Sequence, residues 1–147
     1  APDSAVPGPI LDADGREIGR HEGIAFYTIG QRKRIGIAAR EPLYVVDIDP
    51  ARNAIIVGSD DDLYSSQLTA EDMVYIYERP DKPIALTAKV RYNMKDAPAL
   101  LTPMAGGQAL VRFETPQRAI TPGQAVVCYQ GEDVVGGGTI RMVSGRW

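Results

Sequence analysis

The sequence predicts a mainly β protein, in which a small β-rich module is followed by a small antiparallel β-barrel, with few short helices. Short apolar runs separated by turn residues recur along the chain, and no long stretch has the 3.6-residue period of an amphipathic helix. The 147 residues suffice for one compact domain or two small ones. Prolines among charged residues at 78–83 indicate a boundary. We therefore expect a linker or chain stump at residues 1–7, a first domain at 8–78 and the barrel at 82–147.

The first domain opens with a predicted hairpin in residues 10–18, because Asp14-Gly15 supplies the positive φ that a tight turn needs. Residues 21–30 fit a short helix that ends at Gly30, or else a strand, since so short a run has no decisive period. On the first interpretation, the glycine ends the helix in the left-handed conformation and a loop follows it.

Two more strands are expected at 42–49 and 53–58, and the turn residues between them favour a second hairpin. Residues 65–76 contain a short segment in which Thr69 is a candidate helix N-cap, with Asp72 three places further on.

Strand-like runs then recur at short intervals, at 84–92, 99–102, 109–113, 125–129 and 134–142. Turn residues separate them, at 95–98, 105–107, 121–123 and 130–133. Several short strands with a turn every eight to twelve residues are typical of a small antiparallel barrel.

Composition excludes several classes of protein. No run of eighteen apolar residues is present, so no membrane-spanning helix is expected. Cys128 is the only cysteine and His21 the only histidine, too few for an intramolecular disulfide or for an ordinary zinc site. A lone thiol fits a reducing compartment, so we expect a cytoplasmic protein without a metal site in this sequence.

The net charge of −3 argues against a nucleic-acid partner, but its distribution does not. Residues 28–40 carry four bases and no acid, residues 47–81 carry nine acids against two bases, and residues 82–118 carry six bases against two acids. A polyanion responds to the local field of such basic blocks. The alternative interpretation is ordinary solvated surface charge.

Three stretches are more specific than composition. They are His21-x-Gly23-x-x-x-Tyr27-Thr28-Ile29-Gly30-Gln31-Arg32-Lys33, then Lys89-Val90-Arg91-Tyr92, and then Ala119-Ile120-Thr121-Pro122-Gly123-Gln124-Ala125-Val126-Val127-x-Tyr129-x-Gly131 followed by Gly136-Gly137-Gly138-x-Ile140. In this order and spacing they resemble the C-terminal half of the tRNA-specific 2-thiouridylase family, called MnmA in bacteria, over roughly residues 8–142.

The resemblance implies a function for the whole parent protein. Such enzymes use ATP with Mg to adenylate the wobble uridine of certain tRNAs, and a cysteine persulfide then delivers sulfur. An N-terminal domain does this chemistry, while the central module and the barrel help to hold the anticodon arm. The implied partners are tRNA, that N-terminal domain of the same chain, and a sulfur-carrier protein. The family has also been labelled a methyltransferase, but nothing here suggests a pocket for a methyl donor.

The sequence lacks the family's chemical machinery. No Ser-Gly-Gly-x-Asp-Ser loop, which would bind pyrophosphate, occurs in it. The family uses two catalytic cysteines, one for the persulfide and one that assists it, and Cys128 corresponds to neither. The three glycines at 136–138 follow a strand but open no helix, so they are no phosphate-binding fingerprint. We therefore expect no catalytic residue, no cofactor in this part, and no activity of this part alone.

Two groups of residues are candidates for RNA contact. The first is the expected loop after Gly30, with Gln31, Arg32, Lys33 and Arg34, where the family commonly has glycine in place of Arg34. The second is Lys89 and Arg91, which strand alternation puts on one face, with Val90 and Tyr92 on the other.

Three further residues are candidates for supporting roles. His21 is expected to orient the loop that precedes Tyr27 and not to act in catalysis, although histidine titrates near neutral pH. Tyr27 and Thr28 either contact a nucleotide or help to form the local structure, with Tyr27 packed in the core. An alternative function remains open: a standalone β-barrel adaptor whose acidic residues 47–81 bind a basic protein partner, such as a sulfur carrier.

Overall fold

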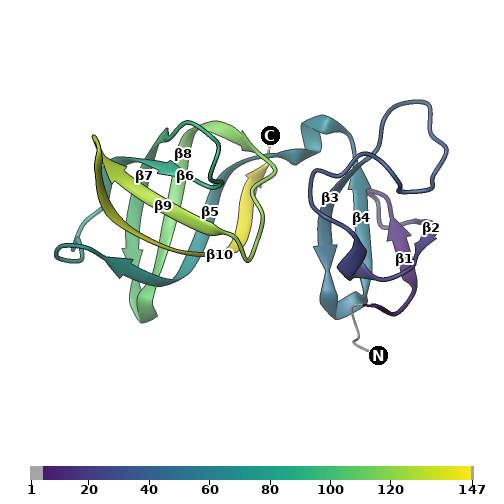
Figure 1. Ribbon diagram of the computed structural model, residues 1–147, viewed down its shortest axis with the longest axis horizontal. Coiled ribbons are helices and arrows are strands. Elements are labelled where there is room, and N and C mark those ends of the chain that lie inside the picture. Colours follow the sequence, from purple (N-terminus) through teal and green to yellow (C-terminus); the bar gives the residue numbers. More distant parts are fainter. Residues whose placement is uncertain (1–4, 147) are drawn as a thin grey trace. The chain divides into compact units, whose positions relative to one another are not determined.

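The computed structural model describes residues 5–146, which form two compact units, and the chain passes from the first to the second between Leu63 and Tyr64 (Figure 1). The described part contains strands and short 3-10 helices but no α-helix, which confirms the predicted fold class. No helix in it is long and apolar enough to cross a membrane.

The first unit contains a four-stranded mixed sheet in the order β2-β1-β4-β3. Its elements are β1 (Gly8–Leu11), β2 (Glu17–His21), η2 (Ile24–Phe26), β3 (Tyr44–Asp49), η3 (Pro50–Arg52), β4 (Ala54–Gly58) and η4 (Asp60–Leu63). β1 pairs antiparallel with β2 and parallel with β4, while β3 and β4 pair antiparallel. Both predicted hairpins are therefore confirmed.

Each hairpin turn is held by an aspartate. The Asp12 carboxylate accepts hydrogen bonds from the N–H groups of Asp14 and Arg16 in the first turn. In the second turn Asp49 accepts from the N–H groups of the following 3-10 helix, and Asn53 then takes the left-handed conformation at φ 50°. Asparagine tolerates this conformation better than most residues, so the chain can turn directly into β4.

Residues 1–7, the predicted linker, are only partly described, since residues 1–4 lie outside the described range. The Asn53 side-chain amide donates to the carbonyl oxygens of Val6 at 2.9 Å and Pro7 at 3.2 Å. The end of this segment is therefore bound to the first unit.

The second unit is a closed six-stranded barrel in the order β10-β5-β8-β7-β6-β9, with every neighbouring pair antiparallel. Its elements are β5 (Tyr64–Tyr75), β6 (Ile84–Lys89), β7 (Ala97–Met104), η5 (Ala105–Gly107), β8 (Gln108–Arg118), β9 (Ala125–Gln130) and β10 (Asp133–Arg146). Each of the five predicted barrel strands is present, and a sixth precedes them.

That sixth strand, β5, corrects two predictions. Thr69 does not cap a helix, because it lies in β5, paired with β8 and β10. The domain boundary does not fall at 78–82, because residues 64–75 are hydrogen-bonded into the barrel. The physical reason is the alternation of β5, which buries Leu68 and Ala70 inside the barrel.

The barrel interior is apolar and closely packed. Leu68, Leu101, Val111 and Ile140 are fully buried in it, together with the Cys128 side chain. The glycines at 136–138 lie within β10, where neighbouring backbone approaches closely: a Cβ on Gly138 would come 2.6 Å from the Glu71 carbonyl oxygen. These glycines therefore allow strands to pack, and do not form a phosphate loop.

Candidate nucleic-acid interface

The predicted basic loop of the first unit is attached to the open edge of β3. The Gly30 N–H donates to the Val45 carbonyl oxygen at 2.8 Å, and the Val45 N–H donates to the Gln31 carbonyl oxygen at 2.9 Å. The predicted helix in residues 21–30 is accordingly only the 3-10 turn η2, which ends at Phe26. Gly30 has a φ of 92°, so the expected left-handed glycine is present, but it begins the loop without ending a helix.

The Gln31 side chain holds the shape of this loop. Its amide oxygen accepts the Thr28 N–H at 3.0 Å, and its amide nitrogen donates to the Lys33 carbonyl oxygen at 2.8 Å. The amide is therefore already bonded at both ends within the loop, as expected of a residue that positions its neighbours.

The three basic side chains lie between two fixed points. Gln31 is attached to β3 on one side, and on the other the buried Ile35 packs with Val45 in the core of the sheet. Arg32, Lys33 and Arg34 between them are all exposed. Arg34 has a φ of 64°, so the residue that stands where the family commonly has glycine adopts the backbone that glycine favours.

The loop encloses an open pocket of about 490 Å³, lined by Arg32, Arg34 and Arg40. Glu41 is the only carboxylate among its lining residues. Within residues 5–146, these three guanidinium groups have no hydrogen-bond or ion-pair partner. Such a group of unpaired, exposed arginines is suited to bind phosphate oxygens.

His21 lies at the end of β2 and is 1% exposed. Its Nδ1 accepts the Gly23 N–H at 3.0 Å, so the proton is on Nε2, which donates to the Asn53 carbonyl oxygen at 2.7 Å. The half-buried Tyr27 packs edge-on against the imidazole, with 5.7 Å between ring centroids. Since both ring nitrogens are bonded within the protein, this histidine is placed to support structure and not to transfer protons.

The second candidate group lies on the outer face of the barrel. β6 ends at Lys89, so the predicted alternation stops there: Val90 is buried, but Tyr92 is 98% exposed and does not share its face. Arg91 is exposed, and its guanidinium donates to the Arg118 carbonyl oxygen at 2.5 Å. The prediction that Tyr92 faces the same way as Val90 is therefore wrong, because the strand has already ended.

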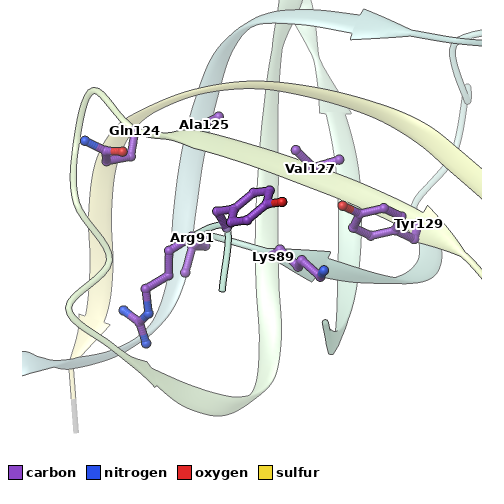
Figure 2. A pocket seen from close by; sticks show the side chains of 8 residues that line it. Lys89, Arg91, Gln124, Ala125, Val127 and Tyr129 are labelled. Atoms are coloured by element: carbon purple, nitrogen blue, oxygen red, sulfur yellow. The ribbon is translucent and has the colours of Figure 1, made fainter. Parts of the chain in front are cut away.

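Lys89 and Arg91 nevertheless line one open pocket of about 470 Å³ (Figure 2). Residues from β9 and the turn before it complete the pocket: Gln124, Ala125, Val127 and Tyr129. The Lys89 ammonium lies 5.6 Å from the centroid of the Tyr129 ring, a cation–π distance.

Sequence reasoning named Arg32 and Arg34 of one pocket and Lys89 and Arg91 of the other, but it did not name three further residues that line them. Arg40 belongs to the same basic block as Arg32, yet only folding of the loop brings them to one pocket. Gln124 and Tyr129 were part of a motif assigned to turn and strand, and the alternation of β9, which buries Val126 and Cys128, was the available sign that Tyr129 points outward.

The single cysteine of the sequence, Cys128, is buried in the barrel. Burial raises the pKa of the Cys128 thiol to about 12, so it is a poor nucleophile at neutral pH. Among residues 5–146, no three His, Cys, Asp or Glu side chains are placed to hold a metal ion.

Comparison with known proteins gives two family matches. Residues 2–59 match the tRNA methyl transferase PRC-barrel domain, and residues 65–140 match the aminomethyltransferase beta-barrel domain. The gap between the two matches contains the boundary between the structural units at Leu63 and Tyr64.

The chain is also similar to curated proteins. The tRNA-specific 2-thiouridylase MnmA of Moorella thermoacetica is 55% identical over 140 residues, which cover 94% of this chain and 39% of the relative. Proteins of the same name from Natranaerobius thermophilus and Roseiflexus castenholzii are each 49% identical, over 95% of this chain and 38% of their own length. The chain thus spans well under half the length of these relatives. It belongs to the tRNA-specific 2-thiouridylase family, and corresponds to the C-terminal part of its members.

Proposed function

We propose that this chain is the tRNA-binding part of a 2-thiouridylase and holds the anticodon arm while another domain modifies the wobble uridine. The observation that carries the proposal is the pocket of the first unit, where Arg32, Arg34 and Arg40 gather on a loop fixed to the sheet. The names of the relatives, which specify tRNA, support RNA as the polyanion.

The physical argument is that phosphate contacts provide most of the sequence-independent affinity for RNA. A guanidinium group binds phosphate through paired N–H donors, and a loop held at Gln31 and Ile35 loses little conformational freedom on binding. The outer pocket of the barrel, with Lys89 and Arg91, offers a second basic contact.

ATP-dependent adenylation and sulfur transfer belong, in this proposal, to the N-terminal catalytic domain of the whole protein. This assignment agrees with the burial of Cys128, which raises the pKa of its thiol. The chain by itself is expected to neither hydrolyse ATP nor thiolate tRNA.

The test is fluorescence anisotropy of a labelled anticodon stem-loop with a thiolation-type wobble uridine, titrated with this chain at low and moderate salt. The variant replaces Arg32, Lys33 and Arg34 with glutamine. Each lost phosphate contact should lower the slope of log affinity against log salt by about 0.7–0.9, so the affinity at low salt should fall most.

A matched control replaces Arg16, Arg20 and Arg52 with glutamine. These three exposed arginines are in the same unit and pair with neighbouring acids. Because each variant loses three basic residues, the net charge of the chain changes equally in both. Equal losses in both variants, or no binding by the folded wild-type chain, would contradict the proposal. In the second case a pull-down with a sulfur-carrier protein would test the adaptor alternative.

A further inference from the structure

The barrel pocket differs in chemistry from the arginine pocket of the first unit. Its floor is formed by Ala125 and Val127, whose side chains point out of the barrel from β9 (Figure 2). Tyr129 stands at one end, and Arg91 and Gln124 at the other, with Lys89 between (Figure 2). Two cations would be enough to bind a phosphate, so the apolar floor and the aromatic ring are suited to contact a further, apolar part of a ligand.

Tyr92 adds a second aromatic ring to this pocket. It is 98% exposed, so its ring is not packed against the protein and contributes nothing to the core. Exposed tyrosine beside cationic residues is a common feature of surfaces that bind single-stranded nucleic acid, because each base has a π face that stacks on an aromatic ring.

We propose that this pocket binds one unpaired nucleotide of RNA, with the base against the tyrosine rings and the apolar floor and the phosphate against Lys89 and Arg91. The proposal rests on the RNA-binding function proposed above, and adds that the barrel recognises an unpaired residue instead of a duplex. Bases inside an A-form helix are already stacked on their neighbours, so their faces are not available to a tyrosine.

The dimensions and the fixed groups agree with this occupant. The pocket volume of about 470 Å³ is within the range of pockets that bind small ligands. It therefore suits an occupant the size of a single nucleotide better than a duplex. The bond from Arg91 to the Arg118 carbonyl oxygen holds the guanidinium at the rim while leaving further N–H donors for a phosphate. Lys89 is likewise held near the Tyr129 ring.

The test compares three labelled RNAs of equal length with the full chain by anisotropy: an unpaired oligouridine, a hairpin with an unpaired loop, and a continuous duplex. The variant Tyr92→Ala removes a ring that supports no core, so the fold is retained. We expect binding of the unpaired and loop RNAs to weaken about 5- to 100-fold, while duplex binding and the salt slope stay unchanged. Tyr92→Phe should restore binding.

Tyr77→Ala is the matched control, because Tyr77 is 72% exposed in the same unit and does not line the pocket. A second measurement is photo-crosslinking of an RNA with one 5-iodouridine, with the crosslinked peptide identified by mass spectrometry. We expect the crosslink at Tyr92 or Tyr129.

Three outcomes would overturn the nucleotide pocket: an unchanged affinity in Tyr92→Ala, an equal loss on duplex RNA, or crosslinks only elsewhere. If the variant at residues 32–34 still weakens RNA binding in that case, the proposed function survives and only the pocket fails. If the folded wild-type chain binds none of the three RNAs, both proposals fail.

Discussion

The Nε2 of His21 donates a hydrogen bond of 2.7 Å to the carbonyl oxygen of Asn53, and thereby joins the end of β2 to the turn between β3 and β4. Gly8 of β1 lies against both groups, because a Cβ there would come 2.9 Å from the same imidazole nitrogen. The Asn53 side chain in turn binds the carbonyl oxygens of Val6 and Pro7. One histidine and one asparagine therefore connect segments from all parts of the first sheet.

This connection predicts a loss of stability in His21→Phe. Phenylalanine keeps the aromatic contact with Tyr27 but leaves the Gly23 N–H and the Asn53 carbonyl without partners. We expect the free energy of unfolding of the first unit to fall by about 2–4 kcal/mol. Hydrogen exchange of the Ile55 and Val57 amides in β4 measures this loss of stability. Unchanged protection of these amides would contradict a stabilising role of His21. The matched control on the same strand is Arg20→Gln.

The backbone of Arg34 predicts opposite effects on stability and on binding. A non-glycine residue at φ 64° is strained by about 1–2 kcal/mol. Arg34→Gly should therefore stabilise the loop by about 1 kcal/mol and weaken RNA binding through the lost charge, whereas Arg34→Ala should lose the charge and keep the strain. Thermal unfolding of both variants measures the effect of the backbone strain, and anisotropy with RNA measures the effect of the lost charge. Equal stability of the two variants would show that the strain is absent.

Gln31 offers a test of positioning without a change of charge. Gln31→Ala removes the two hydrogen bonds that join Thr28 and Lys33, so the basic residues should become more mobile. We expect RNA affinity to fall by about 1 kcal/mol, with the salt slope unchanged because no cation is lost. Nuclear magnetic resonance of the loop amides reports the mobility. A reduced salt slope would instead indicate that Gln31 controls which phosphates are contacted.

The buried Cys128 predicts that alkaline pH destabilises the barrel. Burial raises the pKa of its thiol from 9.0 to about 12. Below pH 9.0 the thiol is neutral in both states, so it adds no pH dependence. As the pH rises from there towards 12 only the unfolded chain ionises, and stability falls by up to about 1.4 kcal/mol per pH unit.

Urea unfolding of the wild type and of Cys128→Ala, from neutral pH to about pH 11, measures this dependence. The variant should be less stable at neutral pH because of the cavity, but should lose less stability at alkaline pH. The pKa of Tyr75 is also raised, chiefly by burial and to a smaller extent by Cys128, so only the part due to burial is common to both proteins. Parallel pH profiles would show that burial does not raise the pKa of the thiol in the folded state.

Local sequence signals were sufficient to predict a structure that depends on one short segment, as both hairpin turns do. Asp14-Gly15 predicted the first hairpin, and the residues from Asp49 to Asn53 predicted the second, because the side chains that form these turns are adjacent in sequence. The same reasoning failed at Thr69, where a local cap pattern suggested a helix. The outcome there depended on the burial of Leu68 and Ala70 against β8 and β10, which are distant in sequence.

By itself, the sequence determined that this protein is mainly β, that its basic residues gather in two blocks, and that its motifs match one family. Tertiary structure alone decided that residues 64–75 close the barrel, that Arg40 joins Arg32 at one pocket, and that Lys89 lies beside Tyr129. The physical reason is that turns and alternation depend on neighbours along the chain. Barrel closure and pocket composition depend instead on which distant strands exchange hydrogen bonds, and no local pattern records that pairing.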